Sequence, residues 1–216
     1  LEFFNENLSH LPEFYSAAAY MIGTKDQLDP ICTILMNIEI DYISVSSTKL
    51  SQVLADTIVK KNEVDQLLLL MAASFSILKV LQAKEFVSIV HRFESFLQDD
   101  LKKPLKMPSF LCLAAISNFS PSSVNYSLLV PAAAQFVNVD SFLMRKASAT
   151  VLHNHITDPN LDLNLVFKLF VENFNQDVVD DCVKIALLEM ASVCNRAEIN
   201  PELLKEMSRI YTFVQS

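Results

Sequence analysis

Four histidines and four cysteines are the side chains best suited to bind a metal ion or to act as nucleophiles. His153 and His155 stand two residues apart on a predicted helix, where they point to nearly opposite faces and cannot share a metal ion. They would come together only if this helix frayed, with Asp158 close in sequence. The cysteines form no CxxC pair and have apolar neighbours: Cys32, Cys112, Cys182 and Cys194. We therefore expect buried, reduced thiols, no metal, no cofactor and no catalytic activity.

Basic side chains are few in this chain, so the places where they gather are informative. The sequence has 17 Lys and Arg against 25 Asp and Glu, which gives a net charge of -8. An acidic surface repels phosphates, and this argues against a nucleic-acid partner. Six cations form small clusters: Lys102, Lys103, Lys106, Arg145, Lys146 and Lys184. They predict a local basic groove that binds an acidic peptide, with ordinary solvated charge as the alternative.

The elements that position these residues are predicted to be helices throughout. Gly23 is the only glycine in 216 residues. Tight hairpin turns and phosphate-binding loops need glycine because it adopts positive φ without strain. A chain almost without it lacks the hairpins of a β-sandwich and any glycine-rich nucleotide loop. The fold class is therefore all-α, with Gly23 suited to end a first helix at Ile22.

Apolar periodicity and capping residues predict about eleven helices. They span 11–22, 30–40, 48–60, 63–82, 84–98, 109–119, a segment from 121 that Pro131 kinks or splits, 141–155 capped by Asp140, 163–174, 176–194 and 202–214. Residues 99–108, with two prolines, are predicted to be the longest loop. The most apolar helices begin near 62, 107, 141 and 176. Fully buried helices that alternate with half-buried ones are typical of an armadillo- or HEAT-like solenoid, and a closed helical bundle is the alternative.

Composition and the two ends of the sequence bound the remaining possibilities. Apolar residues make up 51% of the chain, enough for one large core, so we expect a single helical domain over residues 1–216. No signal peptide and no initiator Met are present, which predicts a piece of a longer protein in the cytoplasm or nucleus. The longest apolar run, 67–78, is too short to cross a membrane. Eight core positions are predicted: Leu69, Ala73, Ile77, Leu113, Ile116, Leu152, Ile185 and Leu188.

Three segments in the second half resemble a known module. Residues 146–155, KASATVLHNH, resemble a helix of PUL domains, the armadillo-like C-terminal modules of the phospholipase-A2-activating-protein family. Residues 108–119 are similar to the family's apolar helix that ends in Asn-x-Phe, and 180–191 are similar to its late helix with a basic residue, here Lys184. The match covers roughly residues 65–195. It departs at Ala114, where family members often carry Arg, and at Met190, near a glycine position.

The resemblance implies a module that binds the C-terminal tail of a valosin-containing-protein-type AAA ATPase in ubiquitin-dependent pathways. Together with the basic clusters, it predicts a non-catalytic protein-interaction module that binds an acidic peptide tail and neither nucleic acid nor membrane. A structural scaffold that holds a folded partner or a second copy is the alternative. The oligomeric state is left open.

Overall fold

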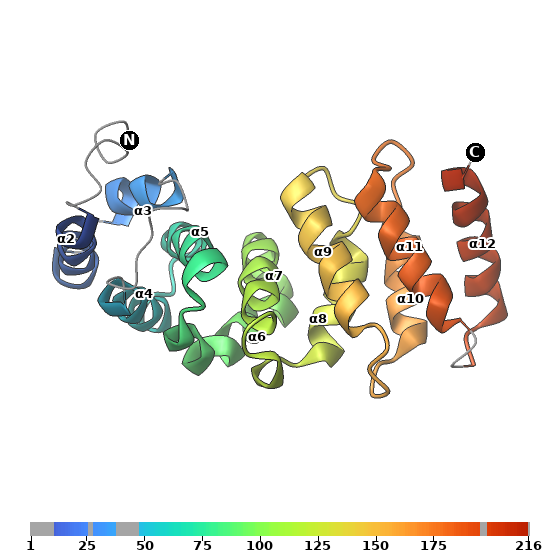
Figure 1. Ribbon diagram of the computed structural model, residues 1–216, viewed down its shortest axis with the longest axis horizontal. Coiled ribbons are helices and arrows are strands. Elements are labelled where there is room, and N and C mark those ends of the chain that lie inside the picture. The colour runs from blue at the N-terminus through green and yellow to red at the C-terminus, as the bar shows by residue number, and fades with distance from the viewer. Residues whose placement is uncertain (1–10, 26–27, 38–47, 195–197, 216) are drawn as a thin grey trace. The chain divides into compact units, whose positions relative to one another are not determined.

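The computed structural model describes residues 11–25, 28–37, 48–194 and 198–215. Within these ranges all regular structure is helical, with eleven α-helices, three short 3-10 helices and no strand (Figure 1). This confirms the all-α prediction. The chain divides into two compact units, Leu1–Val124 and Asn125–Ser216, and each is described by itself below. That residues 1–216 form a single domain stays a prediction.

The first unit holds the six α-helices α2 (Leu11–Lys25), α3 (Leu28–Asn37), α4 (Thr48–Lys60), α5 (Val64–Leu81), α6 (Val90–Gln98) and α7 (Lys103–Ser117). Its 3-10 helices are η4 (Lys84–Ile89), η5 (Asp100–Lys102) and η6 (Pro121–Ser123). Helix α2 packs on α3 and α4, while α5 packs on α3, α4 and α7, and α6 packs on α7. The aromatic rings of Phe86, Phe93 and Phe110 are fully buried among these helices.

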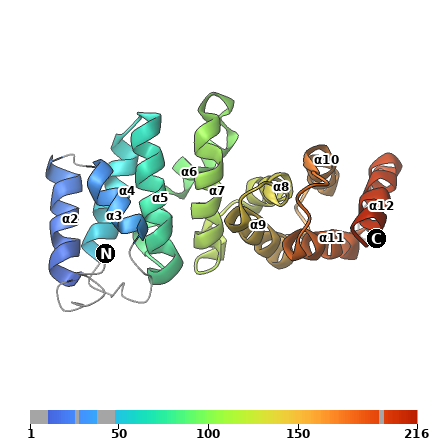
Figure 2. The same ribbon diagram turned by 90° about the horizontal axis from the view of Figure 1, so that it is seen from above.

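The second unit holds five helices: α8 (Tyr126–Phe136), α9 (Phe142–His155), α10 (Leu163–Asn173), α11 (Asp181–Val193) and α12 (Pro201–Gln215). Helix α8 packs on α9 and α10, α9 packs on α11, and α10 packs on α12. Figure 2 shows the resulting two layers of this unit, with α8, α10 and α12 in one and α9 and α11 in the other. Each helix therefore contacts the helix two places along the chain.

A regular period relates four of the helices. The first residues of α5, α7, α9 and α11 are Val64, Lys103, Phe142 and Asp181, so each start follows the previous one by 39 residues. Two series of residues that are 39 apart keep the same buried environment in all four helices. One such series is buried throughout: Leu70, Ser109, Ser148 and Leu187. A second is also buried throughout: Ala73, Cys112, Val151 and Met190. The sequence predicts the repeat but with uneven spacing, because two of its helix starts are wrong.

Residues 99–108 are one of these errors, since they do not form a long loop. Helix η5 begins at Asp100 and α7 at Lys103, with the Asp99 carboxylate accepting a bond from the Leu101 N–H at 2.9 Å. Pro104 lies in the first turn of α7, where a missing N–H costs no intrahelical bond. Of the two prolines, only Pro108 lies in the interior of α7, beyond its first turn. Two prolines in ten residues are therefore compatible with a helix here.

Several predicted caps also differ from the structure. Asn125 rather than Ser120 caps α8, and the helix is not split at Pro131. Ser141, next to the predicted Asp140, caps α9. Helix α11 begins five residues later than predicted because Asp180 caps it. The predicted helix end at residue 40 lies outside the described residues.

Gly23 lies inside α2 and has no positive φ, so its predicted role at the end of a helix is wrong. A Cβ at this position would come within 3.2 Å of Cγ1 of Val53 on α4. Glycine here allows close approach of two helices rather than a turn.

The predicted core is confirmed at five positions and wrong at two. The buried ones are Ala73, Ile77, Leu113, Ile116 and Leu152, while Leu69 is half-buried. Ile185 and Leu188 are 45% and 52% exposed. Helix α11 is apolar on most of its circumference, but it buries only one side, formed by Val183, Ala186, Leu187, Met190 and Val193.

Candidate functional site

Arg145, one of the six predicted binding cations, joins α9 to α11. Its Nε donates to Oδ2 of Asp180 at 2.8 Å, and its Nη1 donates to the carbonyl oxygens of Val139 and Asp140, both at 2.7 Å. The guanidinium also lies over the Phe142 ring, 5.8 Å from its centroid. Only 12% of the Arg145 side chain is exposed. Arg145 is thus engaged inside unit 2, where it holds two helices in register.

Asp180 completes this junction from the side of α11. Its Oδ1 accepts from the backbone N–H groups of Cys182 and Val183 at 2.9 and 3.2 Å, which caps the helix. Burial acts to raise the pKa of Asp180, but the bond from Arg145, the two backbone donors and the Arg145 charge outweigh it and hold that pKa below its usual range. One carboxylate therefore ends a helix and anchors it to its neighbour.

Polar side chains make three further links between segments of unit 2 that are far apart in the sequence. His153 on α9 bonds Glu189 on α11, with Nδ1 and Oε1 2.8 Å apart. The Asn164 amide donates to the Glu198 carbonyl at 3.2 Å and accepts from the Asn200 N–H at 2.8 Å. Asn138, 5% exposed, bonds the Asn175 N–H and the Val178 carbonyl in the same manner. The residues joined by Arg145, His153 and Asn164 are 35, 36 and 36 apart, so these bonds fix the register of the repeat. Sequence reasoning missed both asparagines.

The three predicted cations of unit 1 are engaged to different degrees. Lys106 Nζ lies 2.6 Å from Oδ1 of Asp100, and this bond and its charge lower the pKa of Asp100. Lys102 Nζ lies over the Phe96 ring, 5.3 Å from its centroid. Lys103 is exposed at the start of α7. Because each unit is described by itself, these residues are not placed relative to the cations of unit 2.

Two predicted cations of unit 2 remain on its surface. Lys146 on α9 is exposed, and Lys184 on α11 is 49% exposed, with Nζ 3.6 Å from Oδ1 of Asp181. Ile185, next to Lys184, holds the position on α11 that Lys146 holds on α9, 39 residues earlier. Burial and the Asp180 charge raise the pKa of the Cys182 thiol in the first turn of α11, while the charges of Arg145 and Lys146 act in the opposite direction. We call Lys146, Lys184 and Ile185 the α9–α11 face.

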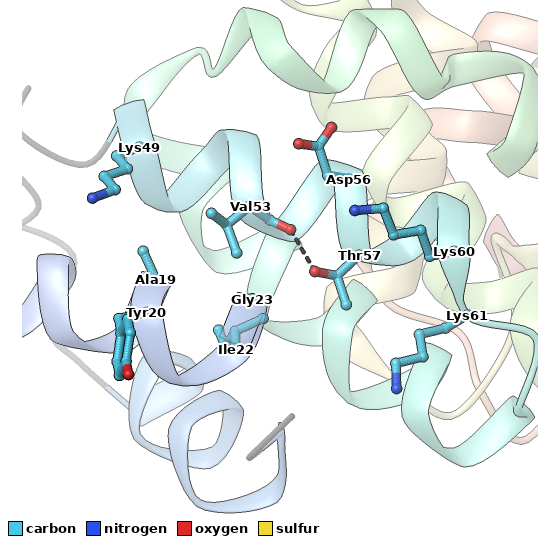
Figure 3. A pocket seen from close by; sticks show the side chains of 10 residues that line it. All are labelled: Ala19, Tyr20, Ile22, Gly23, Lys49, Val53, Asp56, Thr57, Lys60 and Lys61. Carbon is cyan, nitrogen blue, oxygen red and sulfur yellow. Dashed lines mark hydrogen bonds between the residues drawn. The ribbon is translucent and has the colours of Figure 1, made fainter. Parts of the chain in front are cut away.

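A hollow of about 610 Å³ opens between α2 and α4 in unit 1 (Figure 3). Figure 3 shows Lys49 near one end of it, Lys60 and Lys61 near the other, and Asp56 between them. The Gln52 amide donates to Asp56 Oδ1 at 2.9 Å. Sequence reasoning missed this hollow, although Lys49, Asp56 and Lys60 lie on one side of a predicted helix because they are seven and eleven residues apart. The hollow is a cationic surface groove because its lining has three lysines and one aspartate.

A second, mainly apolar hollow of about 300 Å³ lies between α11 and α12 in unit 2. Helix α11 contributes Leu187, Ala191 and Cys194, and α12 contributes Leu204, Met207, Ser208, Tyr211 and Thr212. Tyr211 is 39% exposed and Ala191 is also exposed. We call this space the α11–α12 hollow.

The histidines are engaged separately rather than together. His155 stacks on Tyr126 with ring centroids 4.0 Å apart, while His153 bonds Glu189. Burial lowers the pKa of His155, although the Asp158 charge acts in the opposite direction. Helix α9 extends through His155, so the two rings do not converge by fraying. Among the described residues no group of three or more His, Cys, Asp or Glu could hold a metal ion, and no disulfide joins the four cysteines.

No protein-family model matches the chain, and no curated protein or solved structure matches it either. Within the described ranges, no helix is both long enough and apolar enough to cross a bilayer.

Proposed function

We propose that this protein is a non-catalytic protein-interaction module with an armadillo- or HEAT-like helical stack. The 39-residue period of α5, α7, α9 and α11 supports this architecture, as do the contacts between alternate helices in unit 2. In a stack of this kind, each repeat covers the apolar side of the one before it and leaves an outer line of side chains for partners. A cytoplasmic or nuclear location would suit a chain whose cysteines form no disulfide.

The partner that we propose is an acidic peptide segment on the α9–α11 face. The observation that carries the proposal is the exposure of Ile185, at 45%, beside Lys184 on α11. An exposed apolar side chain with lysines on two adjacent helices suits a peptide that has both an apolar and an acidic residue. Arg145 acts by positioning α11, because its Nε and Nη1 donors are engaged with Asp180 and two backbone carbonyls. An acidic C-terminal tail of an AAA ATPase, which the PUL resemblance implies, is the natural first probe.

Calorimetric titration with such a tail peptide tests the proposal. The double variant Lys146→Glu/Lys184→Glu should weaken binding about a hundredfold, because each lost charge-assisted contact is worth about tenfold or more. The control Lys168→Glu/Lys205→Glu changes the net charge equally at exposed sites on α10 and α12 and should bind as the wild type does. Wild-type affinity should also fall as salt rises. Equal affinity of the two double variants would refute the α9–α11 face, and binding that salt leaves unchanged would favour the scaffold alternative.

A further inference from the structure

One side of α9 carries the contacts with α11. Arg145 and His153 both bond residues of α11, and they stand eight residues apart, so they lie along a single stripe of the helix. Ala149, midway along this stripe, is 5% exposed, and the neighbouring Leu152 is completely buried. This stripe is the surface on which the next helix of the repeat packs.

The equivalent stripe on α11 is bare. Residues 39 positions later are Lys184 for Arg145, Leu188 for Ala149 and Ala191 for Leu152. Leu188 is 52% exposed and Lys184 49% exposed, against 5% and 12% for their counterparts on α9. Alanine and leucine exchange places between the two stripes, so they are similarly apolar, yet the stripe on α11 is the more exposed of the two. The contrast with the covered stripe of α9 marks this side of α11 as a candidate interaction surface.

The α11–α12 hollow adjoins this stripe through Ala191. Helix α12 packs on α10, as α10 packs on α8, so it forms the opposite wall without covering the stripe on α11. A helix that packed on α11 as α11 packs on α9 would therefore lie at this hollow. Its lining supplies apolar contacts from Leu204, Met207 and Tyr211 on α12.

We propose that the α11–α12 hollow and the stripe of Lys184, Leu188 and Ala191 bind one amphipathic helix of a partner polypeptide, with an aspartate or glutamate at its N-cap. Lys184 stands where Arg145 stands one repeat earlier, and Arg145 bonds Asp180, the N-cap residue of the helix that packs there. Among the described residues the Lys184 ammonium pairs with Asp181 alone, at 3.6 Å. Because 93% of that aspartate side chain is exposed, an acidic cap can compete for the ammonium. The apolar side of the incoming helix would cover Leu188 and fill the hollow.

This inference concerns a different surface from the α9–α11 face and does not require the acidic tail to bind there. Lys184 borders both surfaces, but Lys146 belongs only to the α9–α11 face. The variant Lys146→Glu therefore separates the two proposals, because it should weaken tail binding and leave helix binding unchanged. Substitutions at Ala191 on one wall and Ser208 on the other, both exposed, test the hollow itself.

The probe is a fluorescent peptide with the sequence of residues 180–194, both cysteines replaced by serine and a hydrocarbon staple joining positions 181 and 185. This is the helix that packs on the equivalent stripe of α9, and the staple compensates for the marginal stability of a helix of this length in isolation. Fluorescence anisotropy of the full 216-residue chain with this peptide should show saturable binding. Ala191→Arg and Ser208→Arg should each abolish it, while far-ultraviolet circular dichroism stays that of the wild type.

Charge reversal tests the polar end of the site. Lys184→Glu should weaken binding of the probe about tenfold, and a probe with lysine at its first position should recover that loss on the variant protein. A probe with proline at position 187, which breaks the helix, should not bind. The proposal is overturned if the stapled probe shows no saturation up to about 1 mM protein, if both arginine variants bind it normally, or if the proline-containing probe binds equally well.

Discussion

The junction of Arg145 with Asp180 provides the sharpest test of how unit 2 is held together. In Arg145→Ala, the Asp180 carboxylate loses its charged partner and two backbone carbonyls lose a donor. The Asp180 side chain is 29% exposed, so water compensates only in part. A charge-assisted hydrogen bond contributes about 1.5–3 kcal/mol and a neutral one about 1 kcal/mol, less where water can replace it. We expect Arg145→Ala to lower the free energy of unfolding by about 2–4 kcal/mol.

The matched control lies one repeat later. Lys184→Ala removes a cation from the equivalent position on α11, where the ion pair with Asp181 spans 3.6 Å and is exposed. Exposed pairs contribute little, so this variant should lose less than about 1 kcal/mol. Urea denaturation followed by circular dichroism measures both variants. A loss in Arg145→Ala no greater than that in Lys184→Ala would refute the argument that the guanidinium joins two helices.

The same junction predicts a pH dependence with a definite sign. Because the pKa of Asp180 in the folded protein lies below its ordinary value of 3.8, the ionised carboxylate favours the folded state. That contribution is fully present above the unfolded-state value and is lost as the pH falls through the lower folded-state value. Asp180→Asn keeps a capping oxygen but removes the charge. The stability difference between wild type and Asp180→Asn should therefore be constant near neutral pH and shrink below pH 3.8. A difference that persists undiminished under acid conditions would contradict this.

Two further predictions concern packing in unit 2. Leu187→Ala should cost about 2–5 kcal/mol because Leu187 is 2% exposed, whereas Leu188→Ala, one residue later and 52% exposed, should cost less than about 1 kcal/mol; equal losses in urea denaturation would show that the exposed side of α11 is wrongly assigned. Asn138→Ala should cost about 2–4 kcal/mol because it leaves the Asn175 N–H and the Val178 carbonyl without their partner. Faster hydrogen exchange at the amide of Asn175 checks this, and unchanged exchange there would rule out the bond.

The fold class could be predicted because it depends on residue types that act locally. One glycine and the 3.6-residue period of apolar side chains are enough to predict helices. Boundaries failed where two local rules competed. Pro104 and Pro108 indicate a loop when they are counted together, but the first occupies a helical turn in which proline is tolerated. Asp177 and Asp180 are both plausible caps, and only the bond from Arg145, 35 residues away, favours the second.

The surface could be predicted less well, because exposure depends on which neighbour covers a helix. Ile185 and Leu188 stand in an apolar stretch that resembles that of the buried helices, and nothing in the stretch itself shows that one side is uncovered. Arg145 has the charge expected of a residue that binds an acidic peptide, but it bonds Asp180 within unit 2, and only its contacts show this. The period of 39 residues is the signal that would have helped, because it aligns Arg145, which bonds Asp180, with Lys184, which is exposed.

The period also defines a block of 39 residues by which the chain could lengthen through duplication. The block of residues 142–180 begins with the first residue of α9 and ends with the residue that caps α11. A copy of this block inserted after Asp180 would bring its own arginine and its own capping aspartate, in the same order and at the same separation. The Arg145–Asp180 bond would then be formed by residues of a single block, so duplication would preserve this contact at every junction. The His153–Glu189 bond would not be copied with it, because Glu189 lies outside the block. The Arg145–Asp180 bond is therefore a contact that each added block would repeat, and Lys184 occupies the position equivalent to Arg145 in the following repeat.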